Sequence, residues 1–511
     1  MRRVDFASIL NKSSNILPKI IAGLLAVITV VGLGTAILTA YFGVPMGDDY
    51  LAIKTYSNKH TWVAESWHSL TNTGRYMQSA TSSVAYGAFR DNIGVILPFI
   101  VMAWLYVLIV LYLRLANKKF RLSIHKAGIY AIAAPILFIF MSAGRPDGVN
   151  HLWFAYQPFF FSSAIVTYTI GVLLYLSLIY FVLTSGWFSK KTIVVKSTLV
   201  FVTTYILGLY NETTPATAFG ISVLALLIIA FAPIVKNKLK HQYIALLSST
   251  AAASVFALVT MYFSPSSIAR RQNLTSLGTD RSNLVESVLT NFNTTISSLV
   301  LRPSDIALIF LIGITFYLLV LGKQSRSNLK PVSLSLTGAG VIMTGLLTLL
   351  GTLVLLGLGY GATPNVYPRT LLIPQLVINS GLIILAVGLV SWLYSYHKAK
   401  SIQVAVLVIF TIGAFIITPH HIARSAGHIT GAQDYNAIWQ NQDSQLKDLS
   451  RSNPEETVYI KDEGAGIGDG FSTKCTGPYT KSTIWLADGM EAYYGLREIC
   501  AQSDLNGKTN E

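Results

Sequence analysis

Residues 20–44 read IIAGLLAVITVVGLGTAILTAYFGV and contain no charged side chain. A helix rises about 1.5 Å per residue, so this run can cross the hydrocarbon core of a bilayer, which is about 30 Å thick. The run is too long for the apolar core of a signal peptide, and no small-residue cleavage pattern stands out near it. We therefore expect a retained transmembrane helix here.

The rest of the chain has the same character. Of its 511 residues, 52% are hydrophobic and 12% are charged, and the mean hydropathy is +0.53; soluble domains carry about 25% charged residues. We predict an all-α polytopic membrane protein with about eleven transmembrane helices. The predicted spans are Ile20–Val44, Gly94–Leu113, Ala127–Ala143, Phe160–Leu183, Ile193–Tyr210, Ala216–Val235, Tyr243–Phe263, Ile306–Leu321, Val332–Leu358, Leu371–Tyr394 and Val404–Thr418.

Alternate loops are rich in basic residues and nearly free of acidic ones. The segment 114–126 contains five Lys or Arg and no acidic residue, and 323–330 repeats the pattern with three. The positive-inside rule then predicts a multi-pass protein of the cell (plasma) membrane with a cytoplasmic N-terminus and an extracytoplasmic C-terminus. The net charge of +15 is thus a topology signal, and no nucleic-acid partner is expected.

The long loops lie on the predicted outer side, above all 44–92 and 264–302, which indicates that the chemistry is there. Residues 1–420 form the predicted transmembrane domain, and the polar segment 421–511 forms a small α/β extracytoplasmic domain. In it we expect a helix at Asp434–Ser450, a strand at 457–460 and a second helix at Asp488–Cys500. Cys475 and Cys500 favour a disulfide over two reduced thiols in that compartment, worth roughly 3 kcal/mol.

Two adjacent aspartates, Asp48 and Asp49, follow the first predicted span. A carboxylate pair at a membrane surface is typical of a proton acceptor or a cation site, although a solvated loop start fits equally well. Charged and aromatic residues near other outer helix ends favour the first interpretation, since Arg binds phosphate and a carboxylate can act as a general base. These substrate-binding candidates are Trp67, His68, Arg75, Tyr76, Arg145, Asp147, His151, Glu212, Arg270, Arg271, Tyr367 and Arg369. Asn211-Glu212-Thr213 also fits a helix cap.

The order of these motifs resembles the GT-C class of membrane glycosyltransferases. More closely, it resembles a bacterial branch of undefined function related to enzymes that depend on polyprenyl-phosphate sugars. The resemblance covers most of the chain. It includes Trp439 in a helix after the last span, a Val-Tyr-Ile strand, and Tyr493-Tyr494-Gly495.

The resemblance implies a sugar donor linked to polyprenyl phosphate. The donor would sit in the membrane lipid and be used from the outer face, and the acceptor would be a glycan, a lipid or a protein. Asp48 or Asp49 would be the catalytic base, and the choice between them stays open. Arg270, Arg271 and Arg369 would bind the lipid phosphate, and Glu212 would orient the acceptor or Asp48. The chain lacks a clear second acidic motif with metal-ligand spacing, so no cofactor is predicted and a divalent metal is left open.

Two other functions remain as alternatives. A transporter or flippase of a lipid-linked or polar solute normally carries ionisable residues inside its spans, and these spans are nearly free of them. A non-catalytic membrane scaffold would use the outer domain to bind a partner.

Overall fold

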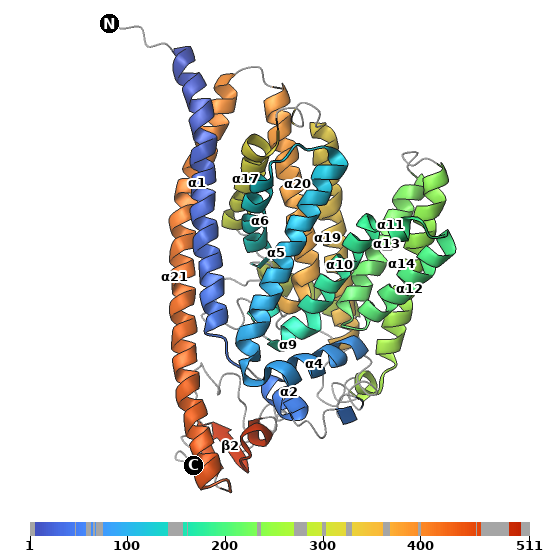
Figure 1. The fold of residues 1–511 in the computed structure, drawn as a ribbon, viewed down its shortest axis with the longest axis vertical. Coiled ribbons are helices and arrows are strands. Elements are labelled where there is room, and N and C mark those ends of the chain that lie inside the picture. The colour runs from blue at the N-terminus through green and yellow to red at the C-terminus, as the bar shows by residue number, and fades with distance from the viewer. Residues whose placement is uncertain are drawn as a thin grey trace.

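The computed structural model describes residues 6–45, 48–57, 63–64, 67, 75–141, 157–160, 162–231, 237–269, 284–298, 303–322, 326, 330–360, 368–396, 400–455, 457–460 and 490–501. These residues are mostly helical, and the helices stand side by side as an elongated bundle (Figure 1). Seven helices of this described part are long and apolar enough to cross a membrane, and shorter apolar helices accompany them. The prediction of a polytopic all-α membrane protein is therefore confirmed.

The seven long segments are Ile16–Tyr41, Tyr76–Phe120, Ser162–Thr184, Lys240–Tyr262, Pro331–Leu355, Leu372–Ser395 and Ser401–Ala423. The shorter ones are Lys126–Met141, Ile193–Gly208, Thr213–Leu227 and Ser304–Val320. Each predicted apolar run coincides with one of them. The principal helices are α1 (Phe6–Tyr41), α5 (Ile93–Phe120), α6 (Lys126–Met141), α10 (Ile170–Thr184), α12 (Ile193–Gly208), α13 (Thr213–Phe231), α14 (Asn237–Tyr262), α16 (Leu284–Ser298), α17 (Pro303–Thr315), α19 (Pro331–Tyr360), α20 (Leu372–Tyr396) and α21 (Lys400–Ser452).

Glycines allow α19 and α20 to pack closely. A Cβ atom on Gly338 would lie 2.6 Å from the backbone nitrogen of Leu385, and one on Gly381 would lie 2.7 Å from that of Ile342. Lipid tails are as apolar as leucine, so helices in a bilayer associate through van der Waals contact rather than the hydrophobic effect. Glycine brings the two backbones within range of such contact.

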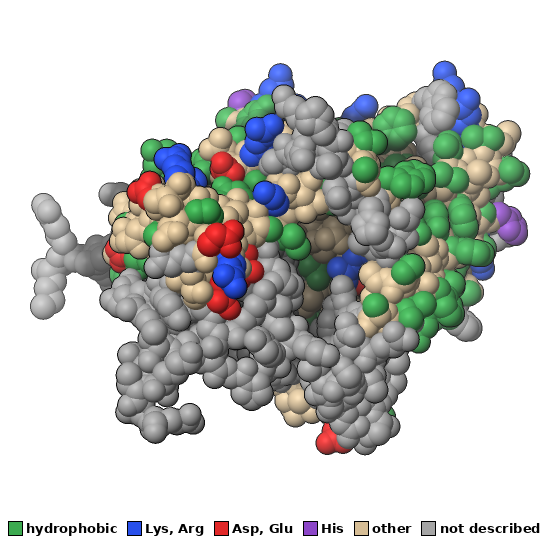
Figure 2. Space-filling view, turned by 90° about the horizontal axis from the view of Figure 1, so that it is seen from below, with side chains coloured by type: hydrophobic (Ala, Val, Ile, Leu, Met, Phe, Trp, Pro, Cys, Tyr) green, Lys and Arg blue, Asp and Glu red, His purple; other side chains and the backbone are tan. Residues whose placement is uncertain are grey.

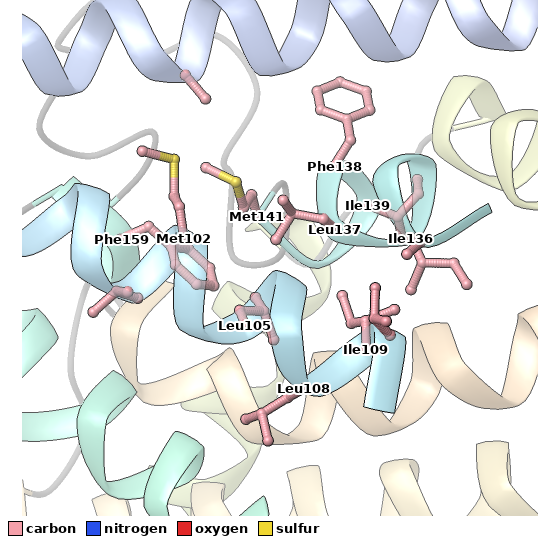
Figure 3. Close-up of a cluster of buried hydrophobic side chains, with 14 of the residues drawn as sticks. Met102, Leu105, Leu108, Ile109, Ile136, Leu137, Phe138, Ile139, Met141 and Phe159 are labelled. Carbon is pink, nitrogen blue, oxygen red and sulfur yellow. The ribbon is translucent and has the colours of Figure 1, made fainter. Parts of the chain in front are cut away.

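The core between α5 and α6 is built from interlocking apolar side chains. Figure 3 shows Met102, Leu105 and Ile109 of α5 directed toward Leu137 and Met141 of α6. The adjacent ring of Phe138 occupies the space that a side chain on Gly32 of α1 would need. This packing attaches α1 to the bundle.

Helices α1 and α21 run side by side along one edge of the bundle (Figure 1). The predicted span Val404–Thr418 and the predicted helix Asp434–Ser450 are parts of one continuous helix, α21, which is 53 residues long. Near the end of α1, the side-chain amide of Asn436 donates to the carbonyl oxygen of Phe42 at 3.1 Å. Helix α21 thus carries the C-terminal region directly to the segment that precedes Asp48 and Asp49.

The C-terminal region contains two short parallel strands, β1 (Thr457–Ile460) and β2 (Glu498–Ala501), with Thr457 opposite Glu498. The predicted strand at 457–460 is confirmed, but the predicted helix at Asp488–Cys500 is wrong in its second half. Residues 490–494 are helical and then Gly495, with φ of +70°, turns the chain out of the helix. The backbone N–H of Leu496 donates to the carbonyl of Glu491 at 3.0 Å, the pattern that ends a helix at a left-handed glycine.

Candidate functional site

One end of the bundle, called here the α4 end, gathers segments that are far apart in the sequence. Helices α2 (Asp48–Ser57) and α4 (Tyr76–Phe89) lie there beside β2, whereas α1 begins at the opposite end (Figure 1). Figure 2 views the α4 end face-on: acidic and basic side chains gather on part of it, and a hollow opens beside them with a basic side chain inside. Two of the polar contacts at this end are made by side chains of α4, Thr81 and Tyr86.

Asp49 is completely buried at the α4 end, with 0% of its surface exposed. The hydroxyl of Tyr86, on α4, donates to its Oδ1 at 2.5 Å. A buried carboxylate is costly unless it accepts hydrogen bonds, and the first turn of α2 supplies a favourable helix dipole as well. Tyr86 follows Ser79 and Ser83 on the buried face of α4. The side chain of Asp48 lies outside the described residues.

Arg75, immediately before α4, forms an ion pair with Glu212, between α12 and α13. The guanidinium Nη2 lies 2.8 Å and 2.9 Å from the two carboxylate oxygens, and Nε lies 3.1 Å from Oε1. The side chains are 16% and 35% exposed, respectively. Two residues that the sequence analysis treated as separate substrate-binding candidates are thus joined by a bidentate contact, the strongest geometry for a guanidinium and a carboxylate.

The turn that carries Glu212 is itself held rigidly. Asn211 is fully buried; its Oδ1 accepts from the backbone N–H of Thr214 at 3.0 Å, and its Nδ2 donates to the carbonyl of Thr167 at 2.8 Å. The first contact confirms the helix-cap interpretation of this segment. The preceding residue, Tyr210, shares a hydrogen bond of 2.5 Å with Thr81 of α4. Glu212 therefore meets Arg75 from a turn that is anchored on both sides.

An aromatic cluster, made of Tyr50, Trp439, Tyr493 and Tyr494, joins α2 to the C-terminal region. The indole Nε1 of Trp439 donates to the hydroxyl of Tyr50 at 2.5 Å. The hydroxyl of Tyr494 donates to Asp443 at 2.9 Å. The pKa of Tyr493 is raised mainly by burial and, to a smaller extent, by the charge of Asp91. The pKa of Tyr494 is raised mainly by burial, and to a smaller extent by Tyr50 and Asp443. Both phenols therefore stay protonated and act as donors.

Sequence reasoning named the aspartate pair, Arg75 and Glu212, but it missed the partners Tyr86, Tyr210 and Thr81. Ser79, Ser83 and Tyr86 have helical spacing, and that pattern was the available signal for a buried polar face. Of the other candidates, Trp67 is 68% exposed and Tyr76 is half-buried at the start of α4.

The remaining candidates are not placed. His68, Arg145, Asp147, His151, Arg270, Arg271, Tyr367 and Cys475 lie outside the described residues. Arg369 lies in a short 3-10 helix, Pro368–Leu371, and Cys500 lies in β2, but the side chains of both are outside the description. Where side chains are described, no group of three or more His, Cys, Asp or Glu is arranged to hold a metal ion.

The chain matches no protein-family model, and a search of curated proteins finds no match either. The α4 end is therefore interpreted from its own geometry and chemistry.

Proposed function

We propose that the protein is an integral membrane glycosyltransferase that moves a sugar from a polyprenyl-phosphate donor to a glycan, lipid or protein acceptor. The observation that carries the proposal is Asp49, a carboxylate buried at the end of a membrane bundle and oriented by Tyr86. A carboxylate that is kept in such a place at an energetic cost is a functional-site candidate.

In the proposed reaction, the acceptor hydroxyl attacks the anomeric carbon of the sugar. The bond from that carbon to the phosphate oxygen breaks, the phosphate leaves with the electron pair, and the hydroxyl proton passes to an aspartate, Asp48 or Asp49. The hydroxyl of Tyr86 donates to Oδ1 of Asp49 and so fixes the orientation of the carboxylate if Asp49 is the base. Because Asp49 has no exposed surface, the acceptor reaches it only when the surroundings of α2 open, as in many enzymes with closing segments.

The ion pair assigns Arg75 a different role from the other arginines. Its guanidinium is already neutralised by Glu212 in a bidentate contact, so a donor phosphate would have to displace a carboxylate to bind it. We therefore assign Arg75 to positioning Glu212 and α4. Arg270, Arg271 and Arg369 stay the proposed ligands of the lipid phosphate.

The proposed topology has eleven crossings, with the four shorter apolar helices included. The basic segment 114–126 begins in the last turns of α5, whose first residue adjoins the α4 end through Arg90–Asn92, so the basic segment lies at the far end of the bundle. With those basic residues in the cytoplasm, the α4 end and the C-terminal α/β domain face the outside, where a lipid-linked donor is proposed to bind.

The test uses Asp48→Asn, Asp49→Asn and the double variant in proteoliposomes. The readout is transfer of radiolabel from undecaprenyl-phosphate hexose or pentose to extracted envelope material. Asp434→Asn is the matched control, since Asp434 is an exposed carboxylate on α21. We expect at least one single variant and the double variant to lose transfer by about 10²-fold or more, the size of a general-base contribution, with the control unchanged. Wild-type transfer that persists in all three aspartate variants overturns the proposal.

A further inference from the structure

We propose that the aromatic cluster is a clamp through which the C-terminal region positions Asp49. Tyr50 and Trp439 are then positioning residues for the reaction at Asp49. The catalytic part of this inference rests on the proposed function, whereas the mechanical part, that the cluster holds α2 in place, does not.

Asp49 and Tyr50 are consecutive residues of α2 whose side chains contact different helices. Successive residues of a helix are about 100° apart around its axis. Asp49 accordingly meets Tyr86 of α4, while Tyr50 meets Trp439, 389 residues further along the chain. Tyr50 is as deeply buried as Asp49. Any rotation or translation of α2 that moves one side chain therefore moves the other.

The C-terminal region encloses Tyr50 in its own apolar core. The ring of Tyr50 packs edge-on against Tyr493, with 5.2 Å between centroids and 66° between planes, and Tyr494 lies 6.1 Å away. The other buried members of this core come from α21, β1, β2 and the segment between them: Leu446, Val458, Met490, Leu496 and Ile499. A residue of the first outer loop thus completes a hydrophobic core that otherwise belongs to the C-terminal region.

Two further contacts bracket the Asp49–Tyr86 hydrogen bond. Before α2, Asn436 donates to the carbonyl of Phe42 at 3.1 Å. After α4, the hydroxyl of Tyr493 donates to Asp91 at 3.0 Å, in the 3-10 turn that joins α4 to α5. The C-terminal region therefore holds the chain before, beside and after the helices that supply Asp49 and Tyr86. A disturbance of the cluster is transmitted to the carboxylate because Tyr50 and Asp49 are adjacent residues of the same helix.

Removing single polar atoms tests the clamp while leaving its packing. Trp439→Phe deletes the indole donor, and Tyr50→Phe deletes the hydroxyl that accepts from it. Trp104→Phe is the matched control, because the Nε1 of Trp104 donates to Ser177 at 3.1 Å within the bundle, between α5 and α10. Tyr493→Phe removes the hydrogen bond to Asp91 and replaces any variant of Trp439 or Tyr50 that does not fold.

The first readout is hydrogen exchange of residues 48–57 in the full-length protein in nanodiscs. We expect exchange to accelerate about tenfold in Trp439→Phe and Tyr50→Phe, since the loss of one hydrogen bond of ordinary strength raises the equilibrium constant for local opening by roughly that factor. We expect no change in Trp104→Phe. The second readout is transfer kinetics: kcat should fall about tenfold or more with KM unchanged, because small misplacements of a reacting group are costly and the donor ligands are untouched.

The outcomes separate the two proposals. Faster α2 exchange in the cluster variants, with no transfer by the wild type, supports the clamp and refutes the proposed function. Transfer by the wild type, with exchange unaltered in the cluster variants, refutes the clamp alone. Faster exchange with kcat unaltered refutes the assignment of Tyr50 and Trp439 as positioning residues.

Discussion

The ion pair between Arg75 and Glu212 offers a quantitative test of how the α4 end is held together. It joins segments 137 residues apart and links the start of α4 to the turn before α13. We consider Arg75→Met, which keeps the aliphatic stem, and Glu212→Gln, which keeps the shape of the carboxylate, singly and together.

The expected coupling follows from burial. Exposed ion pairs contribute about 0.2–1 kcal/mol, and hydrogen bonds to charged groups contribute about 1.5–3 kcal/mol. The side chains of this pair are 16% and 35% exposed and make three contacts of 2.8–3.1 Å. We therefore expect a coupling free energy between those two cases, about 1–2 kcal/mol. We expect Glu212→Gln to be the more damaging single change, because it leaves the less exposed charge without its counter-ion.

The measurement is a double-mutant cycle on the free energy of unfolding, from denaturant titration in mixed micelles. The pair Lys447–Asp443 on α21 is the internal control: it has a single contact of 2.8 Å between residues four apart, and Lys447 is 45% exposed, so the expected coupling is about 0.3–0.5 kcal/mol. A coupling free energy for Arg75 and Glu212 no larger than that of the control contradicts the reasoning that the bidentate contact makes this pair structural.

Two further predictions concern the approach to the aspartates and the docking of the C-terminal region. A Cβ atom on Gly43 would collide with the carbonyl oxygen of Gly94, whereas one on Gly23 meets nothing within 4 Å; Gly43→Ala should therefore destabilise the protein by about 1–3 kcal/mol and Gly23→Ala should not, as measured by thermal unfolding in detergent. The raised pKa values of Tyr493 and Tyr494 mean that the unfolded chain loses these protons above pH about 10 while the folded chain keeps them, so their stabilisation is complete below that pH and declines above it. Proteolysis of the C-terminal region should accelerate above pH about 10, and Tyr494→Phe should reduce that acceleration; an unchanged pH profile in the variant contradicts the assignment.

The membrane helices could be predicted because each depends on a local property of the chain. A run of apolar residues long enough to cross a bilayer must form a helix there, since only then are its backbone polar groups satisfied. The strand at 457–460 was predicted from β-branched and aromatic residues in the same local manner. The helix predicted at Asp488–Cys500 failed at Gly495, where a left-handed backbone ends the helix and pairing with β1 forms β2.

The composition of the chain and its apolar runs thus determined its class and its helices. Only the tertiary structure decided that Asp49 pairs with Tyr86, that Arg75 pairs with Glu212, and that Tyr50 belongs to the core of the C-terminal region. The spacing of these side chains along the sequence does not select their partners. Their partners depend on which helix ends the packing of the bundle brings together, and that packing is set by contacts between residues far apart in the chain.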